Sequence, residues 1–224
     1  MLARHDLAWL APRGWERACA AAPEGSREAL AAWARHGWPA VVTRLPAGLA
    51  PGQVALGLPL PSRPEGCKPR IALAADARDI ERTGPALLLA ETVAAAPASW
   101  QAALAALGNE AGACGFALHV YGSLAFQALT GQACLSARSD IDLLLHPATP
   151  ANCKEALALL VRHARMLPLD GEIVFGGKQG VAWKELATAR DGQARVLAKS
   201  LHAVSLVTVD SLLASLAQDA VCMH

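Results

Sequence analysis

Short hydrophobic runs alternate with Pro- and Gly-rich breaks over the first 82 residues of the chain. The stretch SREALAAWARHG predicts a helix at residues 26–37, with Ser26 as its cap and Gly37 as its stop. Three shorter runs predict strands separated by turns, at residues 38–44, 52–60 and 69–75. This pattern is typical of a small α+β domain, which we place at residues 1–82.

After residue 82 the chain becomes rich in Ala and Leu and then alternates between helix-like and strand-like segments. Helices are predicted at residues 99–112, 123–131, 149–166 and 181–189. Strands are predicted at residues 116–122, 139–147 and 171–177, and mixed elements follow at residues 195–216. Because alternating strands and helices form a sheet covered by helical layers, we expect an α+β fold with a mixed sheet and helices at residues 83–224.

Composition narrows the class of protein. The chain has 224 residues, of which 54% are hydrophobic and 17% charged, and this balance disfavours disorder. None of the six cysteines forms a C-x-x-C pair, which disfavours zinc ribbons and thioredoxin-like redox sites. The polar start does not resemble a signal peptide, and no apolar run reaches the roughly 18 residues of a membrane span. We therefore expect a cytoplasmic protein without a membrane partner.

Charge is distributed unevenly along the chain. The formal net charge is only +1, which disfavours nucleic acid as a partner. Residues 1–82 contain 11 Lys and Arg against 8 Asp and Glu, whereas residues 83–224 contain 9 against 11. The first domain therefore carries a small basic excess that could face an anionic partner.

Two aspartates, Asp140 and Asp142, occupy alternate positions of the predicted strand SDIDLLLHP. Side chains two residues apart in a strand point to the same face, so these carboxylates project together while Ile141 and Leu143 point into the core. Two ionised carboxylates this close repel each other unless a cation lies between them. Oxygen-only ligands favour Mg²⁺ or Mn²⁺, although the spacing also fits two solvated aspartates on an exposed edge strand.

Gly122 and Ser123 lie at the junction between a predicted strand and the helix that follows it. Such a junction offers backbone N–H groups, a helix N-terminus and a hydroxyl, with no side chain at Gly122 to block an approaching anion. An ordinary capping serine after a tight turn would give the same pattern. The order strand, Gly-Ser, helix and D-x-D strand favours a phosphate site beside a carboxylate pair.

A third carboxylate is expected on an adjacent strand, as in sites that hold two metal ions. The segment DGEIVF offers Asp170 and Glu172. Asp170 precedes Gly171 and is expected in the turn, whereas Glu172 lies inside the predicted strand. We therefore predict Asp140, Asp142 and Glu172 as the catalytic and metal-binding residues.

This arrangement resembles the nucleotidyltransferase fold of DNA polymerase beta-like enzymes, in which Gly-Ser, D-x-D and a third acidic residue form the active site. The gap between Ser123 and Asp140 is longer than is usual in this fold, because it contains an additional stretch at residues 130–139. This stretch affects the expected shape of the substrate pocket and not the geometry of the carboxylates. Segments from residue 4 to about residue 200, among them RHDLAWL and VAWKEL, are similar to the phosphoribosyl-dephospho-CoA transferases of the malonate decarboxylase system.

The resemblance implies a specific reaction. The phosphoribosyl-dephospho-CoA group would move from 2′-(5″-triphosphoribosyl)-3′-dephospho-CoA to a serine of the malonate decarboxylase acyl-carrier subunit, and pyrophosphate would leave. Asp140 and Asp142 would hold the metal ions, and Glu172 would complete the site or help to deprotonate the serine. Another nucleotidyltransferase acting on protein, RNA or a small molecule is an open alternative, as is a non-catalytic nucleotide-binding module.

The resemblance also assigns phosphate contacts. Gly122 and Ser123 would hold the triphosphate. Apart from the resemblance, Lys199 and Arg138 are candidates for contacting phosphate, with solvated surface residues as the alternative.

Three basic residues of the first domain are candidates for the acidic carrier protein or the CoA-like tail, or else are solvated: Arg44, Lys68 and Arg70. Trp183 is expected to pack in the core, with stacking on adenine as the alternative. His5 and Asp6 are expected to make structural hydrogen bonds and not to form a catalytic pair.

Overall fold

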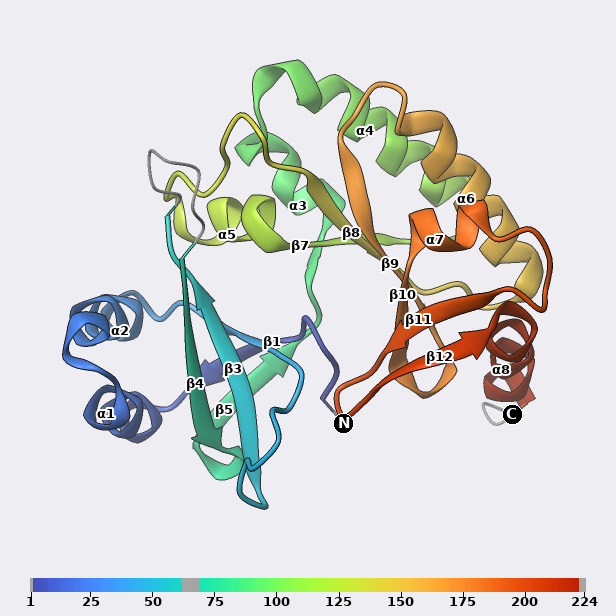
Figure 1. Cartoon of the computed structure of the whole chain (residues 1–224). Helices are drawn as coiled ribbons and strands as arrows, with labels where there is room; N and C mark the ends of the chain where they lie inside the picture. The colour runs from blue at the N-terminus through green and yellow to red at the C-terminus, as the bar shows by residue number, and fades with distance from the viewer. Residues whose placement is uncertain (1, 62–68, 222–224) are drawn as a thin grey trace.

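The chain forms two adjoining lobes, each with its own sheet (Figure 1). The computed structural model describes residues 2–61 and 69–221, so Lys68 lies outside the described residues. Both lobes combine helices with a sheet, which confirms the α+β class. Within the described ranges, no helix combines the length and the apolar character that a membrane span requires.

The first sheet has five strands in the order β4-β3-β2-β1-β5, and all of its strand pairs are antiparallel. Its strands are β1 (Leu7–Leu10), β2 (Ala40–Val42), β3 (Gln53–Pro59), β4 (Arg70–Asp76) and β5 (Ile80–Gly84). Helices α1 (Pro12–Ala21) and α2 (Glu24–His36) lie on one side of this sheet (Figure 1), and the short η1 (Ala77–Asp79) connects β4 with β5. Because β5 pairs with β1, the first sheet ends at Gly84, just after the expected boundary at residue 82.

Three of these strands match the predicted ones, whereas β1, α1 and β5 are not anticipated by the sequence pattern. Helix α2 ends as predicted, because Gly37 adopts a φ of 64° and its N–H donates to the last turn. The predicted start is wrong. The helix begins at Glu24 after Pro23, so Ser26 lies inside the first turn and does not cap it.

The second sheet has seven strands in the order β12-β11-β10-β9-β8-β7-β6. Its strands are β6 (Leu87–Leu88), β7 (Leu118–Tyr121), β8 (Ile141–Leu145), β9 (Leu169–Phe175), β10 (Gln179–Ala182), β11 (Arg195–Lys199) and β12 (Val204–Thr208). Only β8 and β9 are parallel among these pairs, so the sheet is mixed as expected. A parallel pair needs a crossover connection, and helix α6 (Pro150–His163) supplies it.

The other helices of the second lobe are α3 (Leu89–Thr92), α4 (Ala98–Ala113), α5 (Gly122–Thr130), α7 (Trp183–Thr188) and α8 (Val209–Val221), with the short η2 (Val93–Ala95) and η3 (Gly176–Lys178). Ile141, Leu143 and Ile173 are buried in one hydrophobic core with residues of α4 and α6. Side chains alternate across a strand, so Asp142 on β8 points to the opposite face of the sheet. One face of the sheet is therefore core, and the other is available for chemistry.

The structure corrects the expected positions of two aspartates. Asp140 immediately precedes β8 and is not part of the strand. Asp170 lies inside β9 and not in the turn. The reason is the register, because Ile141 N donates to Pro168 O at 2.9 Å and Ile141 pairs with Leu169, so β9 begins before Asp170.

The inserted stretch at residues 130–139 connects the two lobes. Cys134 and Phe126 are buried in the hydrophobic core of the first lobe, where Phe126 lies 6.0 Å from Trp33 between ring centroids. The side-chain oxygen of Gln127 accepts the N–H of Cys134 and holds the stretch against α5. These contacts fix α5 and its first residue, Gly122, against the first sheet.

Candidate active site

Asp142 lies at the centre of a row of polar side chains that crosses three strands. It pairs with Tyr121 of antiparallel β7 and with Asp170 of parallel β9. Paired residues of neighbouring strands point to the same face and are roughly 5 Å apart. Burial raises the pKa of Tyr121, and the negative charges of Asp142, Glu172 and Asp170 raise it further. These carboxylates therefore form one cluster around Tyr121 on the face opposite the core.

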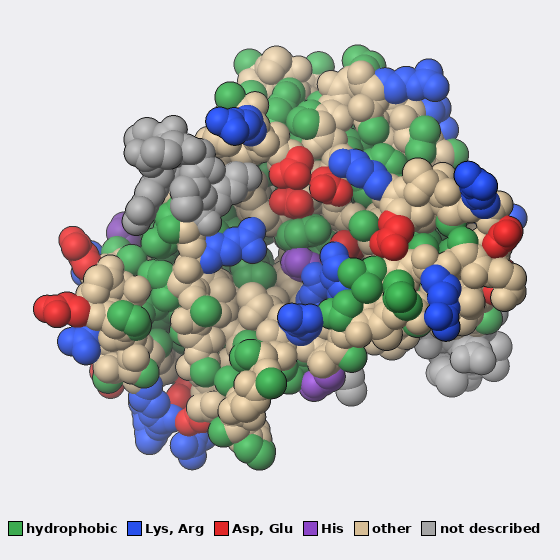
Figure 2. Space-filling view, in the orientation of Figure 1, with side chains coloured by type: hydrophobic (Ala, Val, Ile, Leu, Met, Phe, Trp, Pro, Cys, Tyr) green, Lys and Arg blue, Asp and Glu red, His purple; other side chains and the backbone are tan. Residues whose placement is uncertain are grey.

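The cluster lies in an open position between the lobes. Figure 2 shows acidic side chains gathered at the centre of this face, beside a hollow, with Lys and Arg side chains on both sides. An anionic substrate that carries a divalent cation could reach such a site from solvent.

Gly122 brings the start of α5 into contact with Asp142. Its φ is 70°, and a Cβ at this position would collide with the Asp142 carboxylate. Only glycine satisfies both conditions, because it tolerates positive φ and leaves room for the carboxylate. Ser123 follows in the first turn of α5. The two residues lie at a helix start as predicted, and their contact with triphosphate stays a prediction.

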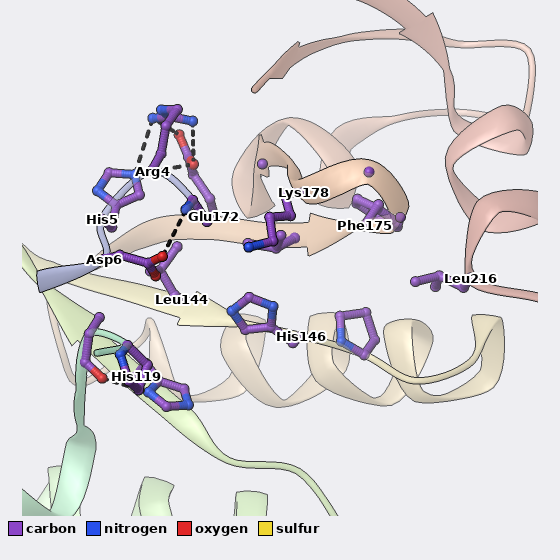
Figure 3. Close-up of a pocket in the computed structure, with 18 of the residues that line it drawn as sticks. Arg4, His5, Asp6, His119, Leu144, His146, Glu172, Phe175, Lys178 and Leu216 are labelled. Carbon is purple, nitrogen blue, oxygen red and sulfur yellow. Dashed lines mark hydrogen bonds and ion pairs between the residues drawn. The ribbon is translucent and has the colours of Figure 1, made fainter. Parts of the chain in front are cut away.

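Glu172 is buried and paired with the N-terminal segment. It is only 6% exposed, and the Arg4 guanidinium donates to both of its oxygens at 3.0 and 3.1 Å (Figure 3). His5 Nε2 and Lys199 Nζ each lie 3.5 Å from the same carboxylate. Burial raises the pKa of Glu172, but hydrogen bonds from His5 and Arg4 outweigh burial and hold the pKa at about 2. The carboxylate is therefore ionised, a weak base, and already engaged on both oxygens.

The segment before β1 connects the two sheets. His5 adopts a φ of 72°, donates its backbone N–H to Val42 O at 2.9 Å, and places its ring 3.9 Å from that of Tyr121. Asp6 accepts the N–H of Ala3 at 2.7 Å. Both residues therefore make structural contacts as expected, although with other partners and not with each other. Burial lowers the pKa of His5.

A cavity of about 430 Å³ adjoins the Arg4–Glu172 pair (Figure 3). Leu144 and His146 continue the Asp142 face of β8 into it, and His119 lines it from β7. Partial desolvation lowers the pKa of His146, and the neighbouring His119 lowers it further. Lys178 also lines this cavity, so its lining combines apolar and charged side chains.

The carboxylates of the cluster have the donor atoms of a metal site but not its geometry. Among the described residues, no three His, Cys, Asp or Glu side chains converge closely enough to hold a metal ion. Asp170 is 38% exposed, accepts the N–H of Gly171 at 2.9 Å and lies 3.7 Å from Lys184 Nζ. Asp140, Asp142 and Asp170 offer only oxygen donors, which are the ligands that Mg²⁺ and Mn²⁺ prefer. The donor chemistry of these three residues therefore fits such an ion, but their carboxylates do not converge on one point in this structure.

The remaining predicted residues differ in their surroundings. Lys199 is tied to Glu172, and its backbone oxygen accepts Arg4 Nη1 at 3.2 Å. Arg138 is exposed on the stretch before Asp140, and its contact with phosphate stays a prediction. Trp183 is buried in the core, which confirms its expected packing role.

Two family models match the chain in succession. The model described as Phosphoribosyl-dephospho-CoA transferase MdcG N-terminal domain matches residues 3–86, and the C-terminal domain model of the same enzyme matches residues 88–210. The chain belongs to the phosphoribosyl-dephospho-CoA transferase family. The resemblance noted from the sequence is thereby confirmed, as is the expectation of a transferase.

Curated phosphoribosyl-dephospho-CoA transferases match most of the chain. The enzyme of Xanthomonas campestris pv. campestris is 42% identical over 189 residues, which cover 84% of this chain and 86% of the relative. The enzyme of Bradyrhizobium diazoefficiens is 32% identical over 207 residues, which cover 91% of this chain and 89% of the relative. No solved structure matches the chain.

Two residues of this candidate site do not follow from the sequence pattern. Arg4 stands in RHDLAWL, a segment similar to the family, but no local signal pairs it with Glu172 across 168 positions of sequence. Asp170 shares its i, i+2 spacing with Glu172, and only the β8–β9 register places it opposite Asp142.

Proposed function

We propose that the protein transfers the phosphoribosyl-dephospho-CoA group from 2′-(5″-triphosphoribosyl)-3′-dephospho-CoA to a serine of the malonate decarboxylase acyl-carrier subunit, with release of pyrophosphate. Family membership supports the transferred group. The observation that carries the proposal is the contact between Gly122 and Asp142. It joins a helix start suited to phosphate with a carboxylate suited to a metal ion.

In this reaction Asp140, Asp142 and Asp170 would hold Mg²⁺ or Mn²⁺. Such an ion would supply positive charge beside the phosphoryl oxygens that gain negative charge. Asp170 replaces Glu172 in this set, because it pairs directly with Asp142 and its carboxylate is partly exposed. Glu172 instead fixes Arg4 and Lys199 at the edge of the site.

The transfer is an in-line displacement at the α-phosphorus. The bond between the serine oxygen and this phosphorus forms as the bond to the bridging oxygen of the β-phosphate breaks. The serine proton passes to a carboxylate of the cluster, and pyrophosphate leaves with the bonding electrons. Glu172 is a poor acceptor of that proton, because its pKa of about 2 makes it a weak base near pH 7.

Intact-mass analysis of the apo carrier tests the proposal. The carrier, the triphosphoribosyl precursor and Mg²⁺ are incubated with the wild type or with Asp142→Asn. A carrier mass increased by one phosphoribosyl-dephospho-CoA group, with the wild type only and lost in EDTA, supports the proposal. Transfer of AMP from ATP to another protein or RNA, with no change in carrier mass, would contradict it and leave a different nucleotidyltransferase activity.

A further inference from the structure

A second, smaller cavity lies where the first sheet meets the start of α5. It has a volume of about 250 Å³, and its lining includes Gly122, Tyr121 and three arginines, Arg4, Arg44 and Arg70. Arg44 follows β2 and Arg70 begins β4, so the first lobe supplies two of these cations to a cavity that ends at Gly122 of the second.

Two of the three cations lack a counter-charge within the cavity. Arg4 is neutralised by Glu172, but in the described ranges neither Arg44 nor Arg70 has a carboxylate partner. Both arginines are exposed. Burial lowers the pKa of His5, and the positive charge of Arg70 lowers it further. Guanidinium groups that line one cavity without a carboxylate favour binding of an anion there.

We propose that Arg44 and Arg70 form a diphosphate-binding subsite that the N-terminal domain contributes to the active site. The inference rests on the proposed function. The cavity of about 250 Å³ is smaller than the roughly 300–1,000 Å³ pockets that enclose whole drug-sized ligands, so it suits a short segment of the substrate such as a diphosphate. Because the cavity adjoins Gly122, an anion bound there lies beside the Asp142 carboxylate and the reacting phosphate.

The donor substrate contains a diphosphate group in two places. One source is the pyrophosphate end of the triphosphate, and the other is the diphosphate bridge of dephospho-CoA. In either case Arg44 and Arg70 act on the donor substrate. The CoA-like tail was one of the alternatives expected for these two residues, and Lys68, the third candidate, lies outside the described residues.

Isothermal titration with inorganic pyrophosphate and with dephospho-CoA tests the subsite and separates the two sources. The doubly substituted variant Arg44→Gln/Arg70→Gln is compared with the wild type and with Arg13→Gln, which removes an exposed arginine of α1 outside the cavity. We expect the double variant to bind at least one of the two ligands about 10-fold or more weakly, because charge-assisted hydrogen bonds to phosphate are lost. The ligand that is weakened identifies the source.

Two results would overturn the subsite. One is equal affinity of the double variant and Arg13→Gln for both ligands, and the other is failure of the wild type to bind either ligand. Because these are binding measurements without a carrier, they are independent of the intact-mass test. If the wild type modifies the carrier and the double variant binds pyrophosphate and dephospho-CoA as tightly as the wild type does, the subsite is refuted while the proposed function stands.

A different observation points to a docking surface beside the site. Leu197 of β11 pairs with Leu206 of β12, and Val204 pairs with Lys199, so these side chains share one face of the sheet edge. Leu197, Val204 and Leu206 are between 37% and 57% exposed. Lys199 reaches Glu172 from this face, so the surface is continuous with the face of the carboxylate cluster.

We infer that this β11–β12 surface receives the carrier protein of the proposed function. Exposed apolar side chains beside Arg195, which starts β11, fit a protein surface that carries an acidic and an apolar contact residue, whereas Lys199 is already paired with Glu172. Figure 2 shows hydrophobic side chains lying open beside basic ones to the right of the hollow. A carrier seated there would present its serine toward the carboxylates.

Charge placed on this surface tests the inference. Leu206→Glu is compared with Met166→Glu, which changes the most exposed large hydrophobic residue described, 77% exposed and located after α6. We expect Leu206→Glu to raise the KM for the carrier about 10-fold, with the KM for the triphosphoribosyl precursor unchanged. Identical carrier KM values for the two variants would refute it. So would a change confined to the oligomeric state, which would make this surface a contact between copies of the chain.

Discussion

The hydrogen bonds that His5 and Arg4 make with Glu172 predict a measurable pH dependence of stability. The pKa of Glu172 falls from 4.5 in the unfolded chain to about 2 in the folded protein. A carboxylate with a lower pKa in the folded protein than in the unfolded chain stabilises the folded protein at a pH above the unfolded-state pKa. This stabilisation is lost as the pH falls toward the folded-state pKa. The 2.5-unit difference corresponds to about 3 kcal/mol, and roughly 2 kcal/mol of it is lost between pH 4.5 and pH 3.

The assay is urea denaturation of the wild type and Glu172→Gln at constant ionic strength between pH 7 and pH 3. The difference in unfolding free energy between the two proteins should fall by about 2 kcal/mol over the acidic part of this range, because Gln does not titrate. Glu110→Gln is the control. Glu110 pairs with Arg162 and His163 on the surface, where solvent screens the interaction, so its difference curve should be much flatter.

A second variant removes Arg4, the partner of Glu172 in the ion pair. Arg4→Met leaves Glu172 buried without its bidentate partner, which should destabilise the protein by about 3–5 kcal/mol at pH 7. Loss of the Arg4 hydrogen bonds raises the pKa of Glu172, while the hydrogen bond from His5 still lowers it, so the destabilisation should shrink as the pH falls. A flat difference curve for Glu172→Gln, or Arg4→Met instability that grows on acidification, would refute the conclusion that His5 and Arg4 hold Glu172 ionised.

Three further predictions concern the carboxylate cluster. Asp142→Asn should abolish carrier modification in the intact-mass assay while its unfolding free energy stays within about 1 kcal/mol of the wild type, and appreciable turnover would contradict its metal-binding role. Asp170→Asn should lower kcat about 100-fold and raise the Mg²⁺ concentration needed for half-maximal rate, whereas the exposed Asp191→Asn should change neither. Gly122→Ala should destabilise the protein by about 1–3 kcal/mol in urea denaturation, because the residue has a positive φ and its new Cβ would collide with the Asp142 carboxylate. The control Gly25→Ala in α2, whose Cβ meets no atom within 4 Å, should be nearly neutral, and equal effects of the two changes would show that Gly122 is an ordinary turn residue.

The local pattern of the sequence was sufficient to locate the start of the site. Gly122 lies at a strand-to-helix junction, and Gly131 ends α5 with a φ of 70°, as its position after an apolar run predicts. Asp142 alternates with Ile141 and Leu143, which are buried on the other face. These features depend on neighbours within a few residues, so the order of residues alone determines them.

Other features depend on contacts between distant segments, and only the tertiary structure decided them. Asp170 faces Asp142 because β8 and β9 pair in parallel with a particular register, and a shift by one residue would have turned it into the core. Arg4 neutralises Glu172 from the opposite end of the chain, and Arg44 and Arg70 meet Gly122 across the two lobes. The sequence specifies which side chains share a face of a strand, because backbone geometry alternates them. Which faces meet is set by long-range packing, and that packing exchanged the expected roles of Asp170 and Glu172 in the site proposed here.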